Sequence, residues 1–112
     1  MYNFNFLENE KLIDIFDNTL IKQGDNEKIT TIALTDKRLL FLDYLNINNG
    51  IEAIRISRGV HYTRYKEVYY QIDLNDIKSL SENEYFSITL KDKTTIEFNN
   101  EKLYKLLKNI IL

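Results

Sequence analysis

The sequence predicts a mainly β domain, α+β by count of its elements. In it, about seven short antiparallel strands form a barrel that a C-terminal amphipathic helix caps. Two observations lead to this prediction. From residue 19 to residue 99, β-rich runs alternate with turn clusters of Gly, Asn and Asp, and residues 101–111 carry apolar side chains at helical spacing. The length of 112 residues fits one domain.

The start of the chain, residues 7–17, is interpreted as a short helix. Leu12, Ile13 and Phe16 fall at positions i, i+1 and i+4, which lie on one side of a helix. Acidic residues occupy the expected first turn, where the positive end of the helix dipole favours them. We therefore expect residues 1–17 to form an N-terminal helical extension.

The next segment has the pattern of paired strands. Residues 19–23 fit a strand that ends at the turn cluster of residues 24–26. Residues 28–34 and 38–44 are β-rich and lie about one turn apart, which favours a hairpin. The second run is apolar on both faces over residues 39–42, so we expect the barrel interior on one side and a helix on the other.

The middle of the chain is the least regular part. Residues 45–59 are rich in Asn and predict an irregular excursion, within which residues 51–56 fit either a short helix or a strand. Residues 65–74 alternate and predict a strand. Its expected faces are Val68, Tyr70, Ile72 and Leu74 on one side and Glu67, Tyr69, Gln71 and Asp73 on the other.

The last third predicts a short strand over residues 77–81 and then a hairpin of residues 85–91 and 94–99 around a tight turn at Asp92. The side chains expected to face the interior are Phe86, Ile88, Leu90, Ile96 and Phe98.

The terminal helix is expected over residues 100–112, with Asn99 or Asn100 as its cap. Its apolar stripe consists of Leu103, Leu106, Leu107, Ile110 and Ile111. Five large apolar side chains, at about 1.5–3 kcal/mol each when buried, are too much to leave in water. The helix is therefore expected to plug the open end of the curled sheet.

Three segments carry a family resemblance. Residues 33–41 have the sequence Ala-Leu-Thr-Asp-Lys-Arg-Leu-Leu-Phe, residues 72–80 have the sequence Ile-Asp-Leu-Asn-Asp-Ile-Lys-Ser-Leu, and the hairpin of residues 86–98 runs straight into the terminal helix. They resemble the pleckstrin-homology-like barrel, in particular small bacterial PH-like and GRAM-like domains. Those domains frequently have proline where this chain has Asp73. The resemblance covers residues 18–112.

The resemblance implies a non-catalytic interaction module that forms a single domain and assembles as a homo-oligomer. Within residues 33–41, Thr35 and Asp36 suit a turn because their side chains bond local N–H groups. Lys37 and Arg38 are expected to project at the mouth of the sheet as solvated turn charges.

One stretch, residues 55–66, is the compositional anomaly of the chain. Three of the four arginines and the only histidine lie within residues 55–64. Arginine matches phosphate oxygens with a planar fork of donors, and nearby tyrosines suit a membrane interface or stacking on a base. The candidate residues for binding an anion or a partner are Arg55, Arg58, His61, Tyr62, Arg64, Tyr65 and Lys66. The alternative without a binding function is that residues 55–66 form a solvated or inter-subunit loop.

Other chemistry has weak support. One histidine without cysteine or a paired carboxylate does not complete a metal shell, so no metal and no cofactor are expected. The carboxylate pairs Asp73 with Asp76 and Glu82 with Glu84 fall in turns and are interpreted as solvated charges. No nucleophile elbow, P-loop or dinucleotide-binding motif occurs, so no catalytic residue is proposed and we expect no enzyme.

The leading functional prediction is an interaction module that acts through protein–protein contacts or self-assembly. The alternative is binding of an anionic lipid headgroup or another small anion by residues 55–66. The formal net charge of −2 argues against nucleic acid. The chain has no cysteine, no apolar run of membrane-spanning length and no signal-peptide pattern, which predicts a cytoplasmic protein.

Overall fold

A computed structural model of the chain describes residues 2–3, 5–44 and 66–111. The excursion predicted for residues 45–59, with its undecided part 51–56, lies outside the described residues. The elements in chain order are β1 (Tyr2–Asn3), β2 (Leu12–Gln23), β3 (Asn26–Thr35), β4 (Arg38–Tyr44), β5 (Lys66–Asp73), the 3-10 helix η1 (Leu74–Asp76), β6 (Ile77–Glu82), β7 (Phe86–Leu90), β8 (Thr95–Phe98) and α2 (Glu101–Ile111).

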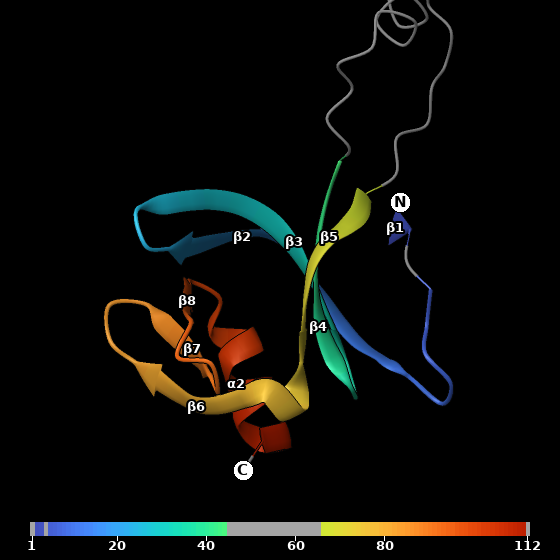
Figure 1. Cartoon of the computed structure of the whole chain (residues 1–112). Helices are drawn as coiled ribbons and strands as arrows, with labels where there is room; N and C mark the ends of the chain where they lie inside the picture. The colour runs from blue at the N-terminus through green and yellow to red at the C-terminus, as the bar shows by residue number, and fades with distance from the viewer. Residues whose placement is uncertain (1, 4, 45–65, 112) are drawn as a thin grey trace, which may run out of the picture.

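The described strands form one curled sheet in the order β1-β5-β4-β3-β2-β8-β7-β6. Neighbouring strands are antiparallel, except that β1 runs parallel to β5. Strands β2–β5 form one half and β6–β8 the other, and α2 lies between them (Figure 1). The predicted arrangement of seven antiparallel strands and one C-terminal helix is confirmed.

The core fills the space between the two halves and α2. Its buried members are Phe16, Ile32, Leu34, Leu39, Phe41, Ile72, Ile77, Ile88, Leu90, Ile96, Phe98, Leu103, Tyr104 and Leu107. The inward face predicted for the last hairpin is confirmed, since the other four predicted residues are members of this cluster and Phe86 packs against it. The β3–β4 hairpin and the short strand β6 also lie where the sequence predicts them.

The terminal helix begins after Asn100, whose Oδ1 accepts a hydrogen bond from Leu103 N at 3.0 Å. Asn99, the alternative cap, instead accepts a bond from Leu20 N at 3.0 Å. Four of the five predicted stripe residues pack on the core, but Ile110 is 40% exposed. Tyr104, which the stripe omitted, is buried because its ring stacks on Phe86 at 4.7 Å between centroids.

The predicted N-terminal helix over residues 7–17 is wrong. The chain has a turn at residues 8–9 and then enters β2, which pairs with β3 from Leu12 onward. The register of this pairing shifts between Leu12 and Asp14 and again between Phe16 and Thr19. Each β-bulge adds one residue to the strand. The bulges therefore break the two-residue alternation of a strand and imitate the spacing of a helix.

Among the described residues, no helix packs on the outer face of the sheet, where one was predicted. Ala33, Leu40 and Leu42 are buried on this face, and Ile15 and Val68 pack against them. The pairing of β4 with β5 skips one residue, Tyr69, which shifts Val68 to the face opposite Ile72. The predicted single face of Val68, Tyr70 and Ile72 is therefore wrong, because a bulge interrupts it.

The N-terminal segment is fastened to the β3–β4 turn. We call this set of contacts the N-terminal clip: residues 35–38 bind residues 5–11. Its bonds outside the buried ion pair are Lys11 N to Asp36 Oδ1 (2.9 Å), Asp36 N to Lys11 O (3.0 Å), Lys37 Nζ to Glu8 O (2.7 Å) and Arg38 Nη2 to Asn5 O (2.6 Å). The interpretation as a solvated turn charge is therefore wrong for Arg38, whereas Lys37 is exposed as predicted and also donates to Glu8 O.

The centre of the N-terminal clip is a buried ion pair. Arg38 Nε donates to Glu10 Oε2 at 2.8 Å, and the two side chains are 13% and 0% exposed. Thr35 Oγ1 and Leu7 N also donate to this carboxylate. Burial alone raises the pKa of Glu10, but the hydrogen bonds from Arg38, Thr35 and Leu7 outweigh it and lower the pKa from 4.5 to about 2.

Candidate functional site

A groove lies on the inner side of β5, where the two halves of the sheet fail to pair. We call it the seam groove. Its volume is about 340 Å³. The lining residues are Tyr70, Gln71 and Ile72 from β5, Asp76 from η1, and Leu90, Lys91 and Asp92 from the end of β7 and the turn after it.

The local sequence opens this gap. Asp73 Oδ1 accepts a hydrogen bond from Asn75 N at 2.9 Å and so caps η1, which turns the chain away before β6 begins. Strand β6 then pairs with β7 and not with β5. Two backbone bonds fasten the rims, Leu74 N to Lys37 O and Lys91 N to Asp76 O, both at 2.9 Å. The seam groove is therefore a fixed feature of the topology.

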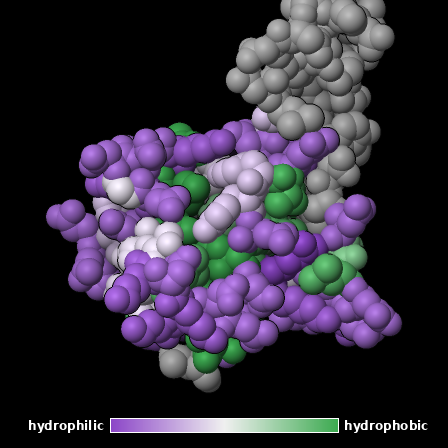
Figure 2. Space-filling view, viewed as in Figure 1, coloured by the Kyte–Doolittle hydropathy of each residue, from purple (hydrophilic) through white to green (hydrophobic). Residues whose placement is uncertain are grey.

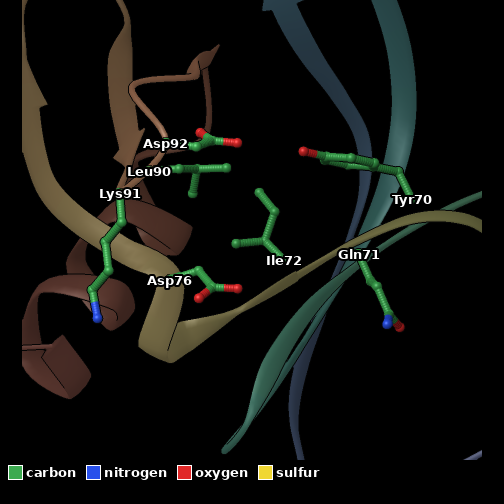
Figure 3. A pocket seen from close by; sticks show the side chains of 7 residues that line it. All are labelled: Tyr70, Gln71, Ile72, Asp76, Leu90, Lys91 and Asp92. Carbon is green, nitrogen blue, oxygen red and sulfur yellow. The ribbon is translucent and has the colours of Figure 1, made fainter.

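The side chains around the seam groove fall into two sets (Figure 3). Those that point into the space are Tyr70, Ile72, Asp76, Leu90 and Asp92, whereas Gln71 and Lys91 point away. The face of the molecule seen in Figure 2 shows hydrophobic residues at its centre with hydrophilic residues around them. The groove thus has an apolar floor with polar groups at its rim.

The floor is largely buried and the rim is charged. Ile72 and Leu90 are buried, while Tyr70 is 39% exposed and its ring lies 5.5 Å from that of Phe41. Asp92 accepts a backbone hydrogen bond from Thr94 N at 2.9 Å, which lowers the pKa of its carboxyl below the usual range. Two carboxylates therefore face the seam groove, and no cationic side chain that lines it points inward.

Over most of its length, the edge of β5 beside the groove pairs with no strand in the part of the chain that the structure describes. Among the described residues, β5 bonds to β4 on one side, and β1 covers only Lys66 and Glu67 on the other. Alternate residues of an antiparallel strand bond to the same neighbour. Because Leu74 N bonds to Lys37 O, the N–H groups of Gln71 and Asp73 point to the seam, where the described residues give them no partner.

The structure places few of the residues that the sequence singled out. The predicted residues Arg55, Arg58, His61, Tyr62, Arg64 and Tyr65 lie outside the described residues. Lys66 begins β5 at the end away from the seam groove, and its Nζ donates to Thr31 Oγ1 at 2.7 Å and lies 3.4 Å from Asp17 Oδ1. It is therefore engaged within the sheet.

Of the predicted carboxylate pairs, Asp73 caps η1 and Asp76 enters the seam groove, while Glu82 and Glu84 are exposed. Sequence reasoning missed the rest of the groove. Its only signals were turn acids at two positions. Within the described residues, no group of three or more side chains is arranged to hold a metal ion. No described helix has the length and hydropathy needed to cross a membrane.

Comparison with known proteins identifies the fold. No family model and no curated protein matches the chain. Among solved structures, the Vps36 N-terminal PH domain matches with a TM-score of 0.58 and 12% sequence identity, over 96% of this chain and 83% of that one. At this identity the likeness shows the fold alone. The chain has a pleckstrin-homology-like fold, as the resemblance in its sequence implies.

Proposed function

We propose that this pleckstrin-homology-like chain is a non-catalytic interaction module whose partner is a segment of protein, bound in the seam groove. Domains of this fold are commonly interaction modules for lipids or proteins. The choice between the two depends on the chemistry of the groove. An anionic headgroup needs cations, whereas the groove directs two carboxylates, Asp76 and Asp92, at its ligand.

The single observation that carries the proposal is the combination of these carboxylates with the unpaired edge of β5. Exposed strand edges bind extended peptides through backbone hydrogen bonds, and pockets beside the edge select side chains. The N–H groups of Gln71 and Asp73 provide the backbone donors. Tyr70, Ile72 and Leu90 provide an apolar surface for an aliphatic stem, with the carboxylates beyond it. An extended segment that carries Lys or Arg fits both.

The alternative predicted from the sequence, binding of an anionic headgroup by residues 55–66, depends on the charge of that stretch. Its one described member, Lys66, is engaged by Thr31 and Asp17. The described residues therefore favour a protein ligand. Sedimentation with vesicles that contain phosphatidylserine and phosphoinositide tests the alternative directly.

The experiment is a titration of the isotopically labelled full chain with a short synthetic peptide of alternating arginine and threonine. We expect saturable shifts of the amide resonances of residues 70–73, 76 and 90–92, and none with the matching glutamate peptide. Asp76→Asn with Asp92→Asn should weaken binding several-fold and not abolish it, since exposed charge pairs each contribute little.

The matched control is Asp25→Asn with Glu27→Gln. It removes the same charge at the exposed β2–β3 turn, away from the groove. If both double variants weakened peptide binding equally, the loss would come from the change in net charge and not from the seam groove. Vesicle binding without any peptide-induced shift at the seam groove would replace this function with the lipid alternative.

A further inference from the structure

Charge is segregated in this chain between one segment and everything else. Residues 55–64 contain Arg55, Arg58 and Arg64 and no acidic residue. Removing these three positive charges from the net charge of −2 leaves −5 on all other residues. We call residues 55–64 the basic segment. It carries the same type of charge that the seam groove is suited to receive.

The basic segment also has the composition of a strand. Ile56, Val60, Tyr62 and Thr63 are β-branched or aromatic residues, which favour extended conformations, and no proline interrupts them. An extended peptide that pairs with β5 needs these properties, and its arginines would lie within reach of the carboxylates on the rim. The segment therefore matches the groove in backbone preference as well as in charge.

The path along the chain's own β5 is obstructed. The segment ends two residues before Lys66, where β5 begins, and the groove begins four residues further on, at Tyr70. To lie beside its own groove, the segment would run back along the free edge of β5 from Lys66. Strand β1 already occupies that edge at Lys66 and Glu67. A segment from another molecule can reach residues 68–73 of this edge directly, without first passing Lys66 and Glu67.

We propose that the basic segment of one copy of this chain binds the seam groove of a second copy, so that the module assembles with itself. This inference rests on the proposed function, since it requires the seam groove to be a protein-binding site. The segment and the groove are different surfaces, so the contact is heterologous. Such contacts close into rings or extend as filaments unless two copies exchange segments reciprocally.

The test uses charge reversal in two full-length variants, followed by sedimentation velocity over a range of concentrations. The segment variant is Arg58→Glu with Arg64→Glu, and the groove variant is Asp76→Lys with Asp92→Lys. The wild type should assemble, more weakly at high salt because screening reduces charge attraction. Each variant alone should dissociate, with its dissociation constant raised at least about tenfold.

Mixing the two variants should restore assembly. The reversed segment then meets the reversed groove, while the remaining native segment meets the native groove. The matched control for the segment variant is Lys78→Glu with Lys108→Glu. It also replaces two cations by two anions, at exposed residues outside the groove, and should leave assembly intact. Far-ultraviolet circular dichroism checks that each variant is folded.

A wild type that stays monomeric at high concentration overturns the inference, and so does assembly that survives both reversals. The proposed function is judged separately. If the chain is monomeric and the arginine–threonine peptide still shifts the groove resonances, self-assembly fails and the protein-binding function stands. If neither assembly nor peptide binding occurs, both fail.

Discussion

Two groups of charged side chains lie on opposite faces of β5, and they differ in how completely they are bonded. In the N-terminal clip, Glu10 accepts bonds from three residues and Arg38 donates to three residues, Gln71 of β5 among them. In the seam groove, Asp76 has no hydrogen-bond or ion-pair partner for its side chain among the described residues. Buried charge here is bonded within the fold, whereas the groove carboxylates are exposed to solvent.

Alternation along one strand separates the two groups. The side chain of Gln71 points away from the seam groove and accepts a bond from Arg38 Nη1 at 2.8 Å. Its neighbours Tyr70 and Ile72 point into the groove. The clip therefore fixes β5 from behind while its inner face stays open. Substitutions in the clip should mainly lower stability, and substitutions in the seam groove should mainly weaken binding.

The largest expected effect comes from breaking the clip. Arg38→Ala leaves Glu10 buried without its cation, which should lower the free energy of unfolding by about 3–5 kcal/mol. Urea denaturation followed by circular dichroism measures this. Arg38→Lys should recover only part of the loss, because an ammonium cannot reproduce the fork that contacts Glu10, Gln71 and Asn5. If Arg38→Ala were as stable as the wild type, the clip would not stabilise the fold.

The next effect is the pH dependence of stability. The pKa of Glu10 is about 2 in the folded chain against 4.5 when unfolded, so its contribution is present above about pH 4.5 and is lost as the pH falls toward 2. The loss should reach about 3 kcal/mol at most. Thermal unfolding at stepped pH measures it. In Glu10→Gln this part of the acid dependence should disappear, while Asp14 and Asp43, whose pKa values are also lowered, retain theirs.

The smallest effect is expected in the seam groove. Asp76→Asn with Asp92→Asn should leave the free energy of unfolding nearly unchanged, because both carboxylates are exposed and asparagine still accepts the bond from Thr94 N. The same urea denaturation measures it beside Arg38→Ala. A loss comparable to that of Arg38→Ala would mean that the groove, like the clip, is part of the structural framework.

The parts of the fold that the sequence predicts correctly are those with an uninterrupted period. The β7–β8 hairpin alternates without a bulge between its paired residues, and α2 keeps helical spacing over its whole length. The failures occur at bulges. Two register shifts in β2 produced the false helix, and the extra residue Tyr69 divided Val68 from Ile72. A bulge cannot be recognised reliably in a single sequence, because pairing with the partner strand determines which residue is left unpaired.

The seam groove could not be predicted for a different reason. Its residues come from three separate segments, 70–72, 76 and 90–92, which only the curvature of the sheet brings together. The sequence showed Asp76 and Asp92 as turn acids and nothing more. Likewise, the four clip residues were visible as a motif, but their partners in residues 5–11 were assigned to a helix that does not form.

The closure of the sheet between β2 and β8 has a consequence for biosynthesis. Ile21 pairs with Phe98, and Leu20 N bonds to Asn99, 79 positions later in the chain. Eight of the fourteen buried members of the core, three of them in α2, come after residue 76. Contacts this distant in sequence form slowly because they require closure of long loops. On a translating ribosome, the nascent β2–β5 half would therefore expose Phe16, Ile32 and Phe41 until the last hairpin and helix leave the exit tunnel.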